Sequence, residues 1–157
     1  MTKAAVVLSS RILDELQGIH ILVTRAKLGW EKSLSQHDDY FLDGVALNLH
    51  GFYSGLERVF EKVATLIDEN VPDGANWHQE LLRQMSLEIP KVRPAVISAK
   101  LREELEEYRG FRHVVRNVYT YQLNPAKMES LVSRLANVIA DVDVELKTFT
   151  KFLQNVE

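Results

Sequence analysis

The sequence predicts an all-α fold, an up-and-down bundle of four long helices and one short helix. Apolar residues recur at alternating intervals of three and four along most of the 157 residues, which is the spacing of one helical face. No β-like alternation of useful length occurs. The stretches rich in turn residues are short, as connections between antiparallel helices are. We therefore expect a single domain over residues 1–157.

The first helix is expected from about Lys3 to Trp30, followed by a short polar connection from Lys32 to Gln36. Its apolar residues are spaced by alternating fours and threes, as in an amphipathic helix that packs against other helices. This stripe consists of Ile12, Leu16, Ile19, Val23, Ala26 and Trp30.

The second helix is expected to begin near Asp38 or Asp39, where a carboxylate caps free amides and opposes the positive end of the helix dipole. Apolar residues then continue at helical spacing to Ile67, so this helix should be central. Three glycines inside it each cost about 1 kcal/mol relative to alanine. We interpret them as points of close approach by another backbone, the alternative being that they are merely tolerated. They are Gly44, Gly51 and Gly55.

Turn residues at 71–76 end this helix, and a short helix is expected from Trp77 to Ser86. Pro90 and Pro94 argue against a long helix in the segment 87–97 that follows. We expect this segment to lie as an extended strap over the bundle. Its anchoring residues would be Ile89, Val92, Val96 and Ile97.

Ser98 is expected to cap a fourth helix that runs to about Tyr121. The dipeptide Asn124-Pro125 then supplies a cap followed by proline at the first helical position, which is a helix start signal. The fifth helix should continue from there nearly to the end of the chain, because apolar residues keep helical spacing as far as Leu153.

Residues 108–128 carry a marked charge asymmetry. Three arginines and Lys127 lie there, with no carboxylate between Glu107 and Glu129, in a chain whose formal net charge is −3. Like charges crowded on one segment repel unless a counter-anion or a function offsets the repulsion. This stretch therefore predicts a local anion site.

Laid on a helix, the stretch forms one line of polar residues. The line consists of Arg109, His113, Arg116 and Thr120, with Arg112, Tyr119 and Asn117 beside it. The opposite side should face the core, and it holds Phe111, Val114, Val115 and Val118.

The first half of the same helix directs Leu101, Leu105 and Tyr108 about a right angle away from that apolar side. Either the helix deforms near Gly110, or both sides are covered and the arginine side lines a cleft or a subunit interface. We favour the second arrangement, because a cleft brings the cations together without exposing Leu105.

Arginines and a histidine on one line suit phosphate. Arginine presents a planar fork of donors to phosphate oxygens, and histidine exchanges a proton near neutral pH. These groups are sufficient in kind for metal-independent RNA cleavage, in which a base takes the 2′-hydroxyl proton, an acid protonates the leaving oxygen and cations stabilise the charge. The alternative is a solvated basic face paired with glutamates of neighbouring helices.

Composition limits the remaining chemistry. Without cysteine the chain has no disulfide, thiolate nucleophile or cysteine-ligated zinc, which is compatible with the cytoplasmic location that we expect. His20, His37 and His78 show no paired metal-ligand spacing, so we predict no metal and no cofactor. His50 fits a core or edge position better than the cleft. No apolar stretch reaches the ~18–20 residues that span a bilayer, so no membrane association is expected.

Four segments carry a family resemblance. Residues 108–119 resemble the signature region of HepT-like proteins of the HEPN superfamily, and the resemblance extends to residues 45–58, 77–82 and 89–98. It implies a helical bundle, usually a homodimer. It also implies either a ribonuclease toxin of a toxin–antitoxin pair or the substrate-binding companion of a minimal nucleotidyltransferase. In the toxin pairs this nucleotidyltransferase is the antitoxin, and it can modify a tyrosine beside the toxin's active site.

The chain departs from the HEPN pattern at its centre. HEPN ribonucleases typically carry an arginine, often followed by asparagine, and then a histidine after four to six intervening residues. Here Arg116-Asn117 supplies the start, but the position five residues after Arg116 is Tyr121 and no histidine follows. The available histidine, His113, precedes Arg116 by three residues. The nuclease pair is therefore either rearranged or lost.

The resemblance also places a tyrosine two residues beyond the usual histidine. That position is Leu123 here, so Tyr119 or Tyr121 would have to take the role.

The first hypothesis is a toxin that cleaves RNA without metal in an Arg/His cleft of a dimer. His113 would be the general acid or base, Arg112 and Arg116 would hold the phosphate, and Asn117 would orient the phosphate or neighbouring side chains. The substrate-binding residues would be Arg109, Tyr119 and Tyr121. The alternatives are a noncatalytic substrate- or partner-binding subunit for a minimal nucleotidyltransferase and an assembly scaffold without nucleotide chemistry.

Overall fold

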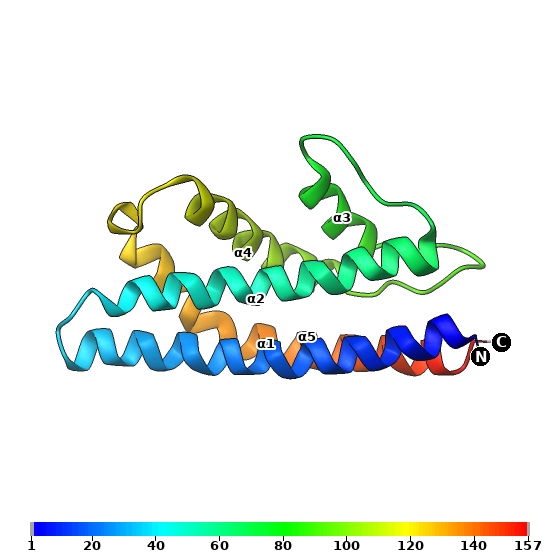
Figure 1. Ribbon diagram of the computed structural model, residues 1–157, viewed down its shortest axis with the longest axis horizontal. Helices are drawn as coiled ribbons and strands as arrows, with labels where there is room; N and C mark the ends of the chain where they lie inside the picture. The colour runs from blue at the N-terminus through cyan, green and yellow to red at the C-terminus, as the bar shows by residue number, and fades with distance from the viewer. Residues whose placement is uncertain (1, 157) are drawn as a thin grey trace.

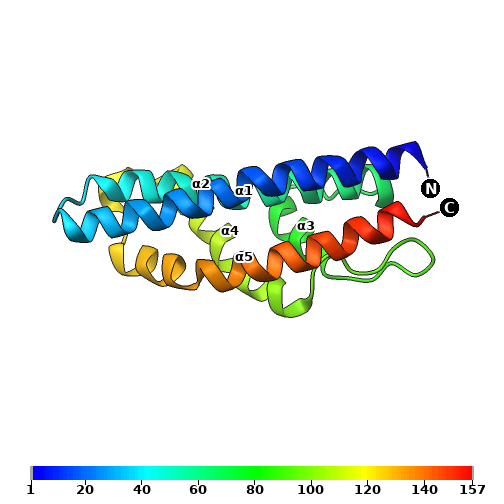
Figure 2. The same cartoon turned by 90° about the horizontal axis from the view of Figure 1, so that it is seen from below.

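The computed structural model describes residues 2–156 and confirms the all-α fold. Helices α1, α2 and α5 run along the long axis of the molecule, and α3 and α4 lie on the side of α2 that faces away from α1 (Figure 1). Figure 2 shows α5 alongside α1. The helices are α1 (Lys3–Ser35), α2 (Phe41–Val63), α3 (Trp77–Met85), α4 (Ala99–Asn117) and α5 (Pro125–Gln154).

The helix lengths are graded rather than divided into four long and one short. Helix α1 has 33 residues and α5 has 30, whereas α4 has 19 and α3 has nine. Helix α2 continues into a π-helical turn, Ala64–Asp68, and a 3₁₀ turn, Thr120–Gln122, separates α4 from α5. Helix α2 is central because it packs against α1, α3 and α4.

Helix α1 is longer than the sequence predicts. The expected connection at residues 32–36 is helical as far as Ser35, and His37 then adopts a positive φ of 51°. The hydroxyl of Ser33 donates to the carbonyl of Trp30 at 2.6 Å, so this polar residue bonds within its own helix. No glycine or proline interrupts residues 32–36, so the helix has no reason to stop at Trp30.

Helix α2 begins at Phe41 rather than at Asp38 or Asp39, because Asp38 Oδ1 accepts from the amide of Tyr40 at 3.0 Å and holds the preceding turn. Two of the three glycines are close-packing points. A Cβ on Gly55 would lie 2.9 Å from Ile19 Cγ1, and one on Gly51 would lie 3.1 Å from a Leu22 methyl. The approaching atoms are α1 side chains rather than backbone. Gly44 has open space around it, so the same prediction is wrong there.

The segment 87–97 is non-helical, as expected, but its anchors differ. Val96 and Ile97 are buried, whereas Val92 is 43% exposed. Lys91 adopts a positive φ of 67°, and Ile89 pairs with Arg93 in an isolated bridge. This reversal turns Val92 outward and Arg93 inward.

Arg93 is the main anchor of the segment. Its side chain is fully buried and donates from Nε and Nη2 to the two carboxylate oxygens of Asp68, at 2.5 and 2.7 Å. The remaining donors bond the carbonyls of Leu87, Pro94 and Gln84. The guanidinium therefore fastens the segment to the end of the π-helical turn and to the end of α3.

Helix α4 ends at Asn117, not near Tyr121. Val118 and Tyr119 are extended, and the Tyr119 amide donates to Gln122 Oε1 at 3.1 Å. Thr120 therefore does not continue the helical line of Arg109, His113 and Arg116.

The core face of α4 follows the prediction only in part, because Phe111 is buried and Val115 packs against the core. Val114 and Val118 are exposed, and the buried residues follow the direction set by the first half of the helix. They are Leu101, Leu105, Tyr108 and Phe111. The two caps are confirmed, because Ser98 Oγ accepts from the Leu101 amide and Asn124 Oδ1 accepts from the Ala126 amide.

Candidate active site between α3 and α4

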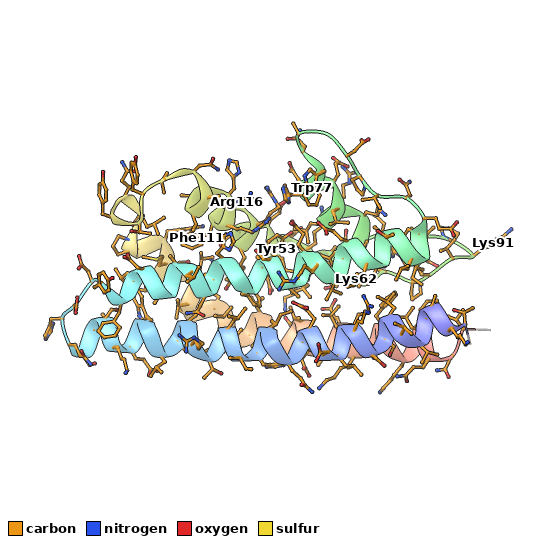
Figure 3. The ribbon with its side chains drawn as sticks, in the orientation of Figure 1. Tyr53, Lys62, Trp77, Lys91, Phe111 and Arg116 are labelled. Carbon is orange, nitrogen blue, oxygen red and sulfur yellow. The ribbon has the colours of Figure 1, made fainter. Side chains whose placement is uncertain are left out.

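A cleft of about 290 Å³ lies between α3 and α4. Figure 3 shows Trp77 and Arg116 on the facing sides of this region. Five of its lining residues come from α4 and one, His78, comes from α3. The α4 residues are Arg109, Arg112, His113, Arg116 and Asn117. We call this site the α3–α4 cleft. It confirms that the arginine side of the helix lines a cleft, and α4 remains helical through Gly110.

The cleft arginines differ in their partners. Arg109 Nε donates to Glu106 Oε2 at 2.6 Å on the same helix, and Arg112 Nη1 donates to Glu57 Oε1 at 3.0 Å. Among the described residues, 2–156, no carboxylate forms an ion pair with Arg116. The expectation of a basic face paired with glutamates of neighbouring helices thus holds for Arg112 alone, because the partner of Arg109 lies on α4 itself and Arg116 has none among the described residues.

Beneath the cleft lies Glu57 of α2, which is only 4% exposed. Its Oε2 lies 2.8 Å from His78 Nδ1, while its Oε1 accepts from Arg112. A buried carboxylate is costly unless it is paired and hydrogen-bonded, and these two partners supply that compensation. Glu57 therefore connects α2, α3 and α4 at the cleft.

Sequence reasoning missed Glu57 and gave His78 little weight. The available signal was the position of Glu57 in the apolar stripe of α2, four residues after Tyr53 and three before Phe60. Both aromatic residues are fully buried. A carboxylate at such a position requires a buried partner.

The burial of Arg112 could likewise have been inferred from its place on its helix. It lies four residues after Tyr108, in the buried direction of α4, and its side chain is only 14% exposed. Its Nε is buried and has no hydrogen-bond partner among the described residues. Arg112 is therefore held against Glu57, whereas His113 and Arg116 are exposed on the outer side of the same helix.

The ring of His78 is held in place by Trp77. The two rings are stacked with centroids 3.6 Å apart. Arg112 Nη1 also lies 3.3 Å from His78 Nδ1. Trp77 is half-buried and packs against the core.

Residues 44–153 match the model of a family described as HepT-like protein. The chain belongs to the HepT-like family. The matched residues include the whole α3–α4 cleft and Glu57 beneath it. Members of this family are generally dimeric and paired with a nucleotidyltransferase. Comparisons with curated proteins and with solved structures gave no significant match.

This HepT-like chain keeps its two candidate tyrosines outside the cleft lining. Tyr119 and Tyr121 are 70% and 82% exposed, and their rings are stacked with centroids 5.8 Å apart. Both follow the end of α4, so the residue five positions after Arg116 does not project from the helix that carries the arginines. The structure thus brings together the five α4 residues predicted for the site but not the two tyrosines.

His50 lies near the cleft of the HepT-like protein without lining it. Burial, followed by the positive charges of Arg112 and Arg116, lowers the pKa of His50 below its ordinary value. Glu57 opposes this shift. His50 is half-buried, so it fits the predicted edge position. Its pKa is sensitive to the positive charges of the cleft.

The other histidines of the HepT-like chain lie elsewhere. His20 Nε2 lies 2.9 Å from Asp143 Oδ1 on the α1–α5 side, and His37 lies in the turn after α1. Within residues 2–156, no three His, Cys, Asp or Glu side chains are grouped as metal ligands. No helix in the same range is long and apolar enough to cross a membrane.

Proposed function

We propose that this HepT-like protein is a cytoplasmic ribonuclease toxin of a toxin–antitoxin pair, which cleaves RNA without a metal in the α3–α4 cleft and acts as a homodimer. One observation carries the proposal. Arg109, Arg112 and Arg116 line one cleft together with two imidazole side chains, and Arg116 has no ion-pair partner among the described residues. This combination supplies cationic stabilisation and proton transfer in one place.

The three arginines have different ion-pair partners, and each would therefore have a different role in the reaction. Arg116 would bind the scissile phosphate, because its guanidinium fork has no carboxylate to compete with the phosphate oxygens. Arg112 would stabilise the charge that develops there while staying fixed by Glu57. Arg109, already paired with Glu106, would contact a neighbouring phosphate.

The remaining predicted residues fit the same reaction. His113, at the outer side of the cleft, would act as general acid or base. The side-chain Nδ2 of Asn117 donates to the backbone carbonyl of His113 at 2.6 Å, so Asn117 would hold the last turn of α4 in the orientation that phosphate binding needs.

The test is cleavage of a labelled single-stranded RNA by the purified full-length protein in the presence of EDTA. The parent protein should cleave, and Arg116→Ala should lose about 10²- to 10³-fold in rate, the usual cost of removing one transition-state donor. Arg25→Ala, an exposed α1 arginine outside the cleft, is the matched control and should retain the parent rate. Absence of cleavage by the parent, or equal rates for Arg116→Ala and Arg25→Ala, would refute the proposal.

A second candidate is a noncatalytic substrate- or partner-binding subunit for a minimal nucleotidyltransferase. The observation that favours it is the exposure of Tyr119 and Tyr121 directly after the arginine-bearing helix. Hydroxyls in this position are open to an approaching enzyme. Mass spectrometry of the protein co-expressed with such an enzyme should find a nucleotide on one of these tyrosines, lost in Tyr119→Phe or Tyr121→Phe. An unmodified protein with no bound enzyme would exclude this function.

A further inference from the structure

We propose that His78, held by Glu57, is the base that accepts the 2′-hydroxyl proton of RNA, and that His113 is the acid that protonates the leaving 5′-oxygen. This inference rests on the proposed ribonuclease activity. It assigns a catalytic role to a residue of α3. His78 would thereby replace the histidine that HEPN ribonucleases usually carry after the arginine and that is missing after Arg116 here.

Glu57 determines which nitrogen of His78 is available. An ionised carboxylate only accepts hydrogen bonds and a guanidinium only donates them. His78 Nδ1 lies 2.8 Å from Glu57 Oε2 but 3.3 Å from Arg112 Nη1, so we take the shorter contact to fix the tautomer, with the hydrogen on Nδ1. In the neutral ring the other nitrogen, Nε2, then carries the free lone pair. A carboxylate that fixes the tautomer and stabilises the imidazolium is the arrangement by which histidine bases are oriented in hydrolytic enzymes.

Two further contacts limit movement of the ring. Trp77 stacks on His78 with centroids 3.6 Å apart, and a Trp face also favours a nearby cation such as imidazolium. Arg112 Nη1 binds the other oxygen of Glu57 at 3.0 Å, so the carboxylate cannot rotate without losing a buried ion pair. Such preorganisation of the base avoids part of the ordering cost in the transition state.

The two imidazoles come from opposite walls of the cleft. His78 belongs to α3 and His113 to α4, and both line the same 290 Å³ space with Arg116. In-line displacement at phosphorus needs a base on the side of the nucleophile and an acid on the side of the leaving group. Two rings on facing helices meet this requirement, whereas two rings on one helical face do not.

The assignment of base and acid follows from their surroundings. His78 has a carboxylate partner that stabilises the positive charge it gains. His113 has no carboxylate ion-pair partner within residues 2–156 and lines the facing wall of the cleft together with Arg116, which would bind the phosphate. Glu57 acts through His78 and is therefore a positioning residue.

The proposed step balances as follows. His78 Nε2 takes the proton of the 2′-hydroxyl, and the 2′-oxygen forms a bond to phosphorus. The bond from phosphorus to the 5′-oxygen breaks, and its electron pair receives the proton of the His113 imidazolium. The products are a 2′,3′-cyclic phosphate and a 5′-hydroxyl, and solvent returns the proton from His78 to His113.

The experiment compares ordinary RNA with RNA whose scissile 5′-oxygen is replaced by sulfur. A thiolate leaves without protonation, so this substrate makes the acid unnecessary and leaves the need for a base. On ordinary RNA, His78→Gln and His113→Gln should each lose about 10²- to 10⁴-fold in rate. On the thio-substituted RNA, His113→Gln should return to within about tenfold of the parent protein, whereas His78→Gln should stay slow, by the same proton-transfer argument.

His78→Ala provides a readout that a purely structural role would not move. Added imidazole should restore its rate in proportion to concentration, because the truncated side chain leaves an opening to the cleft. The control is His20→Gln, which removes another histidine paired with a carboxylate but lies outside the cleft. It should retain the parent rate on both substrates. Circular dichroism melts of each variant establish that the fold is kept.

The outcomes separate this inference from the proposed function. If the parent protein cleaves RNA and His78→Gln keeps its rate, the role of His78 is wrong while the ribonuclease remains. Recovery of His78→Gln on the thio-substituted RNA, or no rescue of folded His78→Ala by imidazole, also overturns the assignment. If the parent protein does not cleave either RNA, the proposed function fails and the assignment fails with it.

Discussion

Glu57 of α2 accepts a hydrogen bond from Arg112 of α4 at 3.0 Å, with both side chains largely buried. This contact closes the floor of the α3–α4 cleft. Glu57 also bonds His78 at 2.8 Å. One buried carboxylate therefore supplies a hydrogen-bond partner both to the Arg112 guanidinium and to the His78 ring. The cleft therefore rests on a buried contact that stabilises the fold.

Glu57→Ala should lower the free energy of unfolding by about 3–5 kcal/mol, because it leaves the Arg112 guanidinium buried without its counter-ion. Urea unfolding followed by circular dichroism measures the change. Glu15→Ala is the matched control, since its ion pair with Arg58 is exposed and exposed pairs contribute about 0–1 kcal/mol. Equal losses in the two variants would contradict a stabilising role for the buried contact.

Asp68→Asn should loosen the segment 87–97, because it removes the charge that holds the buried Arg93 guanidinium. Trypsin cleavage after the exposed Lys91 should then become faster under native conditions, since local opening controls such proteolysis. Asp73→Asn lies in an exposed turn and should leave the cleavage rate unchanged. The interpretation is wrong if both variants are cut at the rate of the parent protein.

Gly55→Ala and Gly110→Ala should change stability in opposite directions. A Cβ at position 55 would lie 2.9 Å from Ile19 Cγ1, and such overpacking costs about 1–3 kcal/mol. A Cβ at position 110 meets no atom within 4 Å, so Gly110→Ala should stabilise the protein by up to about 1 kcal/mol through helix propensity. Thermal melts distinguish the two variants, and a loss at Gly110 would show that α4 needs its flexibility.

The pKa of His50 should be below its ordinary value of 6.5, with burial as the main cause and Arg112 and Arg116 adding to it. NMR titration of the His50 ring measures it. Arg116→Gln should raise this pKa because it removes one of the positive charges, whereas Arg25→Gln should not. A His50 pKa unchanged by Arg116→Gln would mean that the two groups do not interact.

The lowered pKa of His50 also makes the stability of the protein depend on pH. Since the native pKa of His50 is lower than the unfolded value, the unfolded chain binds more protons and acidification favours unfolding. The contribution of His50 to stability is complete above about pH 6.5 and declines as the pH falls toward the native pKa. His50→Gln should therefore show a smaller decrease in urea midpoint between pH 8 and pH 5 than the parent protein.

Much of the fold was predictable because it depends on local patterns. The helical stripes and the caps at Ser98 and Asn124 follow from spacing and from backbone hydrogen bonding. The end of α4 was not predictable from the polar line, because Val118 and Tyr119 leave the helix although their positions still fit its period. The 3₁₀ turn at Thr120–Gln122 replaces a further turn of α4, so the helix ends at Asn117.

The site was predictable along one helix but not across helices. Periodicity placed Arg109, His113 and Arg116 together, since they share a face of α4. Glu57 and His78 are 21 residues apart, and Glu57 and Arg112 are 55 apart. Their meeting depends on how α2, α3 and α4 pack, which spacing within each helix does not encode.

The hydrogen bonds around Arg93 predict which substitutions would inactivate this protein in a genetic selection. Gln84, in the last turn of α3, bonds Asp68, while the amides of Val96 and Ile97 bond the carbonyl of Met85. The helix that carries His78 at its beginning is thus secured at its end. If the protein is toxic to its host, survivors should carry substitutions at Asp68 and Arg93 as well as in the cleft, and these alleles should be temperature-sensitive.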